Sequence, residues 1–188
     1  MKDLERAILI FVVFTIFLGI IYPLVITGIS QVVFPEQANG NLVKNGNGTV
    51  IGSQLIGQNF SSPAYFHGRP SVIDYNSSTS SGSNLGPTNQ KLIANVTQRI
   101  QQIKTEDSLP DNATIPADLV LASGSGLEGY IYVDSAMIQV PRIASTRGIS
   151  ESQVREIITS NQENTFLGLG KEIVNVLKLN IALDNLKK

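Results

Sequence analysis

The strongest constraint in this sequence is an uncharged run over residues 7–35, made mostly of Ile, Val, Leu and Phe. A helix needs about 20 apolar residues to cross the hydrocarbon core of a membrane, so this run is long enough to span one. The apolar region of a cleaved signal sequence has only about 7–15 residues and ends at small residues. Here the run ends at Val33-Phe34-Pro35-Glu36. We therefore predict a retained N-terminal membrane anchor over residues 1–36.

Polar and small residues inside the anchor are candidates for contacts with another helix. Proline removes one backbone hydrogen bond, so Pro23 is expected to bend the span. In hydrocarbon, hydroxyl and amide side chains usually face protein, and glycines allow close approach. A single-span anchor also tolerates a few hydroxyl groups, so both interpretations stay open. The candidate contact residues are Tyr22, Pro23, Thr27 and Gly28.

The cations that flank the anchor predict which side of the membrane the following domain occupies. Lys2 and Arg6 precede the span, whereas the first cation after it is Lys44. The positive-inside rule counts Lys and Arg near the ends of the span. The N-terminus is therefore expected in the cytoplasm, and the C-terminal domain is expected to be extracytoplasmic.

The rest of the chain offers little material for catalysis. A formal net charge of −1 argues against a nucleic-acid partner. Cysteine is absent and His67 is the only histidine, which removes thiol nucleophiles and most routes to a catalytic triad. A lone histidine is also a poor metal centre, so His67 is expected to be a hydrogen-bonded loop residue. We expect no catalytic residue, no metal site and no enzyme activity of the chain by itself.

Residues 37–48 are polar and contain glycine, so they are predicted to link the anchor to a domain spanning residues 49–188. Short apolar runs in this domain indicate strands over residues 49–55, 119–122 and 130–133. Because they alternate irregularly with helical patterns, the chain is predicted to be α+β, with one N-terminal transmembrane helix followed by a single mixed domain.

Two helices have clear start signals. Apolar residues recur at helical spacing after Thr88, which is expected to be an N-cap, and the helix is expected to end near Lys104. Ser150 and Gln153 form a capping box ahead of a second helix. Residues 173–179 are predicted to be a strand or the start of a last helix.

Residues 59–89 are rich in Ser, Asn, Gly and Pro and show little periodicity. Loops of this length are uncommon in compact domains and are usually functional or disordered. Aromatic residues within it predict a loop pinned to the domain: Phe60, Tyr65, Phe66 and Tyr75.

Residues 124–129 match the pattern G-x-G-x-x-G. Dinucleotide binding requires the last glycine of this pattern to open a helix. Here Gly129 leads into Tyr130-Ile131-Tyr132-Val133, which favours a strand. The better interpretation is a tight turn between two strands.

Isolated charged residues leave several possibilities open. Arg69, Arg142 and Arg147 could pair with carboxylates of a partner or with acids of their own domain. Asp74 and Asp118 are expected to be cap or turn residues rather than an acid–base pair.

A series of distinct short motifs is spread in order along nearly the whole chain. The N-terminal half contributes Tyr22-Pro23-Leu24, Thr27-Gly28, Leu55-Ile56-Gly57-Gln58, Tyr65-Phe66, Arg69-Pro70-Ser71 and Tyr75-Asn76. The following part contributes Ser83-Asn84-Leu85-Gly86, Ser123-Gly124-Ser125-Gly126, Gln139-Val140-Pro141-Arg142 and Asn175-Val176-Leu177. With these motifs in this order, the chain resembles the C subunit of the Kdp-type potassium-transporting ATPase, the small one-span subunit of that complex.

This resemblance implies a non-catalytic accessory subunit of an ATP-driven, high-affinity potassium uptake complex. The implied partners are a channel-like potassium-binding subunit and an ATP-hydrolysing P-type subunit. The family is described as a catalytic chaperone that raises the ATP affinity of the P-type subunit. Candidate partner contacts in the domain are Gln58, Tyr65, Phe66, Arg69, Asn76, Asn84 and Arg142.

No stably bound cofactor is expected, and ATP is expected only through the complex. The candidate nucleotide-related turn consists of Ser123, Gly124, Ser125 and Gly126. Because ATP is cytoplasmic and the domain is expected outside, an indirect effect through preferential binding to one pump conformation is favoured.

In one place the chain departs from the family pattern, which usually continues with Asp-Pro-His where Glu128-Gly129-Tyr130 stand here. The alternative function is a membrane-tethered extracytoplasmic domain that binds a small ligand independently of a pump. That alternative predicts a closed pocket.

Overall fold

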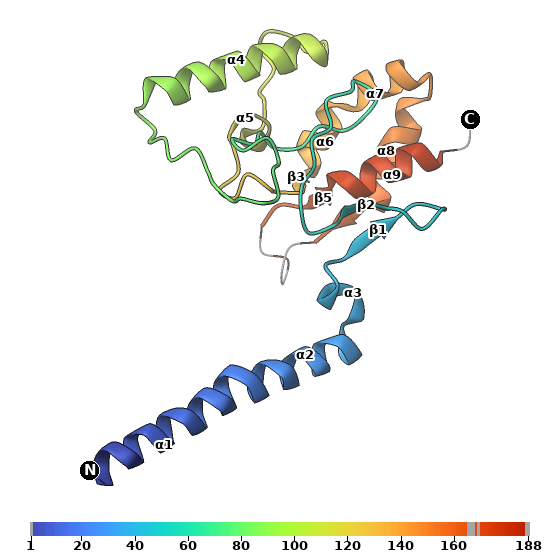
Figure 1. Cartoon of the computed structure of the whole chain (residues 1–188). Helices are drawn as coiled ribbons and strands as arrows, with labels where there is room; N and C mark the ends of the chain where they lie inside the picture. Colours follow the sequence, from blue (N-terminus) through green and yellow to red (C-terminus); the bar gives the residue numbers. More distant parts are fainter. Residues whose placement is uncertain (1, 165–167, 169, 187–188) are drawn as a thin grey trace. The chain divides into compact units, whose positions relative to one another are not determined.

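The computed structural model describes residues 2–164, 168 and 170–186 (Figure 1). The chain divides into two compact units, residues 1–51 and 52–188, and each is treated by itself.

The first unit consists mainly of a continuous apolar helix, Lys2–Val33, of 32 residues. It comprises α1 (Lys2–Ile16), a π-helical turn (Phe17–Ile21) and α2 (Tyr22–Val33). By length and composition this helix could cross a membrane, and its apolar window is not buried inside the protein. The predicted apolar helix at the N-terminus is therefore confirmed.

The helix leaves α geometry just before Pro23, where the backbone N–H of Tyr22 donates to the carbonyl of Phe17. The pyrrolidine ring of a proline clashes with the carbonyl four residues earlier and has no N–H to offer it. A π-helical turn adds one residue to the local ring and relieves this clash. The distortion expected at Pro23 thus takes the form of a π turn.

The remainder of the first unit is short. The helix α3 (Pro35–Ala38) is followed by β1 (Leu42–Lys44), which pairs with β2 (Val50–Ser53) in a two-stranded sheet. The side chain of Asn45 closes the connection by accepting from the N–H of Thr49 at 2.9 Å. The strand predicted over residues 49–55 is present as the shorter β2.

A three-stranded antiparallel sheet lies at the centre of the second unit, with the strand order β3-β5-β4. Its members are β3 (Tyr130–Tyr132), β4 (Gln162–Glu163) and β5 (Ile173–Asn175). Ile131 lies opposite Val174, and both side chains are buried. The strand predicted at 130–133 is confirmed.

Helices surround this sheet and close the core (Figure 1). They are α4 (Gln90–Glu106), α5 (Ala117–Val120), α6 (Val133–Ile138), α7 (Val140–Arg147), α8 (Glu151–Ser160) and α9 (Val176–Asn185). The core contains Ile131, Ile143, Ile158, Leu179 and Leu183. By contrast, α4 buries none of its residues completely, so it packs on the domain along one side only. The α+β class is confirmed.

Two local predictions hold and two need correction. Ser150 and Gln153 form the predicted capping box of α8, and residues 173–179 contain both a strand and a helix start, β5 and α9. The cap of α4 is Asn89 rather than Thr88, because the Asn89 side chain accepts from the N–H of Lys91 at 2.9 Å. The strand predicted over residues 119–122 was wrong.

At that position the chain forms the single helical turn α5. Pro116 stands at its N-cap with an extended ψ of 143°, and the carboxylate of Asp118 is drawn inward to accept from the N–H of Tyr132 at 2.8 Å. The Asp118 side chain also accepts from the Ser135 hydroxyl at 2.6 Å. Asp118 is therefore a buried carboxylate that links α5 to the β3–α6 junction, rather than the helix cap expected from the sequence.

Candidate functional site

Two buried side-chain amides hold the long loop on the domain by imitating strand pairing. Asn180 accepts from the backbone N–H of Phe66 at 2.8 Å and donates to its carbonyl at 3.0 Å. Gln139 does the same for His67, accepting at 2.7 Å and donating at 3.2 Å. The Phe66 ring is fully buried in the core. The loop is therefore pinned, as its aromatic residues predicted.

Arg142, on α7, ties three separate segments together. Its Nε donates to Asp107 at 2.7 Å, and its Nη2 donates to Gln139 at 2.8 Å. Its Nη1 donates to the carbonyls of Pro63 and Tyr65 at 2.6 and 3.0 Å. Arg142 and Asp107 are both buried. The open question of its partner is thereby answered: Arg142 pairs with an acid of its own domain.

Arg147 pairs within the domain in the same way. It donates to the carbonyl of Ala64 at 2.6 Å and to the Asp184 carboxylate at 2.8 Å. Its guanidinium lies 4.7 Å from the centre of the Tyr65 ring, and the Tyr65 hydroxyl donates to Asp184 at 3.0 Å. Tyr65 is thus fixed by a cation–π contact and a hydrogen bond.

The glycine-rich turn over residues 123–127 fixes the other end of the loop. The Ser123 hydroxyl accepts from the Gly126 N–H at 2.9 Å and closes the turn. The Ser71 hydroxyl donates to the carbonyl of Gly126 at 2.7 Å, and the Ser81 N–H donates to the carbonyl of Ser125 at 3.0 Å. The turn therefore serves as an attachment point for the loop. β3 follows it, as the sequence indicated, but the element before it is the helical turn α5 and not the predicted strand.

The segment that departs from the family pattern is in close backbone contact with Gly57. The Gly57 N–H donates to the carbonyl of Leu127 at 2.8 Å. A Cβ placed on Gly57 would come within 2.3 Å of the carbonyl oxygen of Glu128. Gly129 faces the same backbone, since its own added Cβ would lie 3.4 Å from the Gly57 nitrogen. Only glycine fits at position 57 without displacing this turn.

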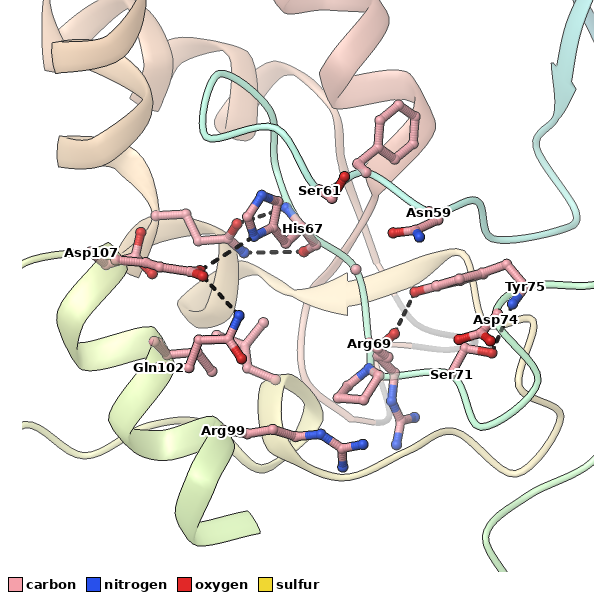
Figure 2. Close-up of a pocket in the computed structure, with 17 residues that line it drawn as sticks. Asn59, Ser61, His67, Arg69, Ser71, Asp74, Tyr75, Arg99, Gln102 and Asp107 are labelled. Atoms are coloured by element: carbon pink, nitrogen blue, oxygen red, sulfur yellow. Dashed lines mark hydrogen bonds and ion pairs between the residues drawn. The ribbon is translucent and has the colours of Figure 1, made fainter. Parts of the chain in front are cut away.

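A pocket of about 300 Å³ opens between the long loop and α4 (Figure 2). The loop contributes residues 59–61 and 67–71 with Asp74 and Tyr75, and α4 contributes Arg99, Gln102, Ile103 and Glu106. The pocket is open to solvent at its rim and mixes polar with apolar lining. The closed pocket expected of an independent small-ligand-binding domain is therefore not the form that this pocket takes.

One end of this pocket is a charged cluster around His67. Its Nε2 lies 3.0 Å from the carbonyl of Ser62, and its Nδ1 lies 3.9 Å from a carboxylate oxygen of Glu106. Burial and the nearby Arg142 guanidinium lower the pKa of His67 below 6.5, so the ring is neutral at physiological pH. Burial raises the pKa of Asp107 against the opposing effect of Arg142. His67 is a hydrogen-bonded loop histidine, as predicted.

The candidate partner contacts in the domain differ widely in exposure. Asn76 and Asn84 are exposed, whereas Gln58, Tyr65 and Arg69 are half-buried. Phe66 and Arg142 are buried and occupied with contacts inside the domain. In the anchor, the candidates Tyr22, Pro23, Thr27 and Gly28 are all exposed.

Several residues that shape the site were not singled out from the sequence. Asp107 and Arg99 carried no recognisable signal by themselves. Gln139 and Asn180 are buried amides, and a polar residue inside an apolar pattern is the signal that could have found them. Arg99 projects from the half-buried side of α4, where its Nη1 donates to the carbonyl of Val120 at 2.9 Å.

Comparison with known proteins gives a match over almost the whole chain. Residues 4–185 match the family model described as "KdpC: K+-transporting ATPase, c chain". This range includes the apolar helix, the long loop and α9.

Curated relatives agree with that match. The chain is 47% identical over 188 residues to the potassium-transporting ATPase KdpC subunit of Mycobacterium tuberculosis (strain ATCC 25618 / H37Rv), covering 98% of this chain and 99% of the relative. It is 45% identical over 199 residues to the protein of the same name from Rhodopseudomonas palustris (strain BisB5), covering 98% and 97%. It is 46% identical over 190 residues to the protein of the same name from Geobacter sulfurreducens (strain ATCC 51573 / DSM 12127 / PCA), covering 99% of each chain.

Proposed function

This chain belongs to the KdpC family of potassium-transporting ATPase subunits, and on this premise we propose that it is a non-catalytic accessory subunit that stabilises the assembled pump. Its partners would be a channel-like potassium-binding subunit and an ATP-hydrolysing P-type subunit. The observation that carries the proposal is the match over residues 4–185, which covers the apolar helix and the domain alike.

The apolar helix would contact a helix of a partner subunit through its polar stripe. Pro23, Thr27, Ser30 and Gln31 recur at i, i+4, i+7 and i+8, so they share one face of α2. Polar groups in hydrocarbon are most favourable when they meet protein. Pro23, Thr27 and Gln31 are exposed and Ser30 is half-buried, so this face is open to such a contact. The Gln31 side chain also accepts a hydrogen bond from Asn39 at 3.3 Å.

The domain would lie outside the cytoplasm and bind the partners through the long loop. Its exposed segment around Asn76 and Asn84 is held in shape by the turn over residues 123–127, because Ser71, Ser80 and Ser81 all bond to that turn. A loop fixed in advance loses less conformational entropy on binding than a mobile one. The shape of the loop therefore supports a role in docking.

The same arrangement supports an indirect effect on ATP affinity. A subunit that binds one conformation of the pump more tightly shifts the population toward that conformation, without touching the nucleotide. The Ser123–Gly126 turn is the candidate nucleotide-related site, and its backbone bonds to Pro70, Ser71 and Ser81 of the loop. We propose that this turn acts by positioning the loop.

Affinity purification tests the assembly. A tagged chain extracted gently from native membranes should carry two larger membrane proteins with it, and deletion should remove potassium-dependent ATPase activity. Recovery of the chain alone, with activity intact in its absence, would contradict the proposal.

A second measurement separates the indirect effect from direct nucleotide binding. Calorimetry on the full chain should show no heat of ATP binding, while the KM of the complex for ATP should rise when the chain is absent. Saturable ATP binding to the isolated chain that Gly126→Ala abolishes would instead favour direct contact through the turn.

A further inference from the structure

Two arginines that line the pocket have no acidic partner among the described residues. Arg142, Arg147 and Arg155 of the same unit each form an ion pair with a carboxylate. Arg69 and Arg99 form none in the part of the chain that the structure describes, although both are half-buried. The lack of a counter-ion at two sheltered cations is unusual, because buried charges are normally paired.

The guanidinium groups of these two arginines reach the same place. Arg99 donates to the carbonyl of Val120 at 2.9 Å, and Arg69 lies 3.5 Å from the carbonyl of the next residue, Leu121. Arg99 comes from α4 and Arg69 from the long loop, so two elements separate in sequence deliver positive charge to one side of the pocket (Figure 2). The two guanidinium groups are therefore close enough to form one positively charged site, which we call the clamp.

Arg69 is also incompletely satisfied. Its Nε is buried and has no hydrogen-bond partner within residues 2–164, 168 and 170–186. The Tyr75 hydroxyl donates to the backbone carbonyl of Arg69 and holds this residue in place. An acceptor that enters the pocket and draws the Arg69 side chain toward it would satisfy the remaining donors.

The charge balance of the lining selects the type of acceptor. Asp107 is already neutralised by Arg142. The remaining lining charges are the two arginines and the two carboxylates of Asp74 and Glu106, with His67 beside Glu106. Two cations opposed by two acids favour a ligand of low net charge over a phosphate dianion, and a guanidinium matches a carboxylate well.

We propose that this pocket binds a small carboxylate whose negative group is held by Arg69 and Arg99. The polar side chains of Asn59, Ser61 and Gln102 around the same pocket would receive the rest of the molecule. The site is independent of the role in the pump proposed above and does not require it.

The test uses the full chain in detergent, titrated with acetate, lactate and glycine at constant ionic strength, with inorganic phosphate as the comparison anion. Binding is followed by calorimetry and by backbone NMR shifts. At least one carboxylate should bind saturably and more tightly than phosphate, and Arg99→Gln should weaken it by about tenfold or more. The matched control is Arg155→Gln, since Arg155 is exposed on α8 and away from the pocket.

Arg99→Lys guards against a variant that fails to fold, because lysine keeps the charge and can still donate to Val120 but loses the fork. It should also weaken carboxylate binding while leaving the unfolding temperature near that of the parent chain. The proposal is overturned if none of the three carboxylates binds, if phosphate binds more tightly, or if neither arginine variant changes the affinity.

A final arm distinguishes a free ligand from an acidic side chain of a partner. The same carboxylate is titrated into the purified complex that contains the chain. Retained binding supports a free small ligand, whereas loss of binding on assembly would mean that a partner side chain fills the clamp and would overturn the proposal.

Discussion

Arg142 shows how one residue can decide where a long irregular segment lies. Its guanidinium contacts Asp107 at the end of α4, Gln139 beside its own helix, and two carbonyls of the loop. A guanidinium carries five donors in a fixed fork, which suits this task better than an ammonium group. The position of the loop therefore depends on a buried charge pair rather than on apolar packing alone.

Replacing Arg142 by methionine should destabilise the chain by about 3–5 kcal/mol, because it leaves the Asp107 carboxylate buried without its partner. The measurement is urea unfolding of the full chain in detergent. Arg155→Met is the matched control: its pair with Glu151 is exposed, and its loss should cost no more than about 0.5 kcal/mol. Equal effects of the two substitutions would show that the buried pair has no special role.

His67 makes stability depend on pH in a definite direction. Its pKa in the folded chain is lowered from 6.5 by burial and by Arg142, so the unfolded chain binds the proton more readily. Its neutral form thus supports folding above pH 6.5, and this support is lost as the pH falls toward the folded pKa.

Wild-type chain should therefore lose more stability than His67→Gln between about pH 7.5 and 5.5. The urea midpoint at each pH is the measurement. The raised pKa of Asp107 has the opposite sign: its contribution favours the folded chain at low pH and is lost as the pH rises above 3.8. Because Asp107 is present in both chains, the comparison with His67→Gln isolates the histidine. A loss in His67→Gln as large as in the parent would contradict the assignment.

At the scale of elements, contacts between irregular segments, rather than strand pairing, determine how the long loop and the segment before it are attached. The segment 123–127 bonds to the loop at several points, and Gly57 lies directly against Glu128. β3, β4 and β5 are only two or three residues long. Because the strands are so short, contacts between irregular segments hold much of the domain in place.

Gly57→Ala tests this contact. The added Cβ would meet the backbone carbonyl of Glu128 at 2.3 Å, which no side-chain rotation can relieve. We expect a loss of about 1–3 kcal/mol in unfolding free energy, as for other overpacked sites. Gly86→Ala is the control, because its added Cβ meets nothing within 4 Å; a similar loss there would refute the steric explanation.

The sequence predicted the helices that depend on residues close together in the chain. It did not predict the elements that depend on contacts between distant segments. The capping box of α8 and the apolar helix depend on residues within a few positions of each other. The turn α5 looked like a strand because Leu119, Val120 and Leu121 form an apolar run. Its helical form depends on Asp118 reaching Tyr132 and Ser135, which lie later in the chain.

The same limit applies to the site. The motifs around Arg69 and Gln139 were visible, but nothing in the sequence placed Arg99 beside Arg69 or Gln139 beside His67. Those pairs join α4 and α7 to a loop that has little periodicity of its own. Only the folded domain brings them together, through side-chain bonds to backbone groups that pattern analysis does not register.

At the scale of the whole molecule, orientation in the membrane is the property that the flanking charges predict most directly. Lys2 and Arg6 lie before the uncharged run of residues 7–35, and Lys44 is the first cation after it. The absence of cysteine makes the prediction easy to test, because any introduced cysteine is unique.

Asn76→Cys should react with a membrane-impermeant maleimide in intact cells, because Asn76 is exposed in the domain that we place outside. Asp3→Cys is the matched control: Asp3 lies in the first turn of the helix, before the uncharged run, and is also exposed, so the cysteine should react only after permeabilisation. The reverse pattern would place the domain in the cytoplasm. It would also allow direct contact with ATP, and the indirect effect on the pump proposed above would lose its main support.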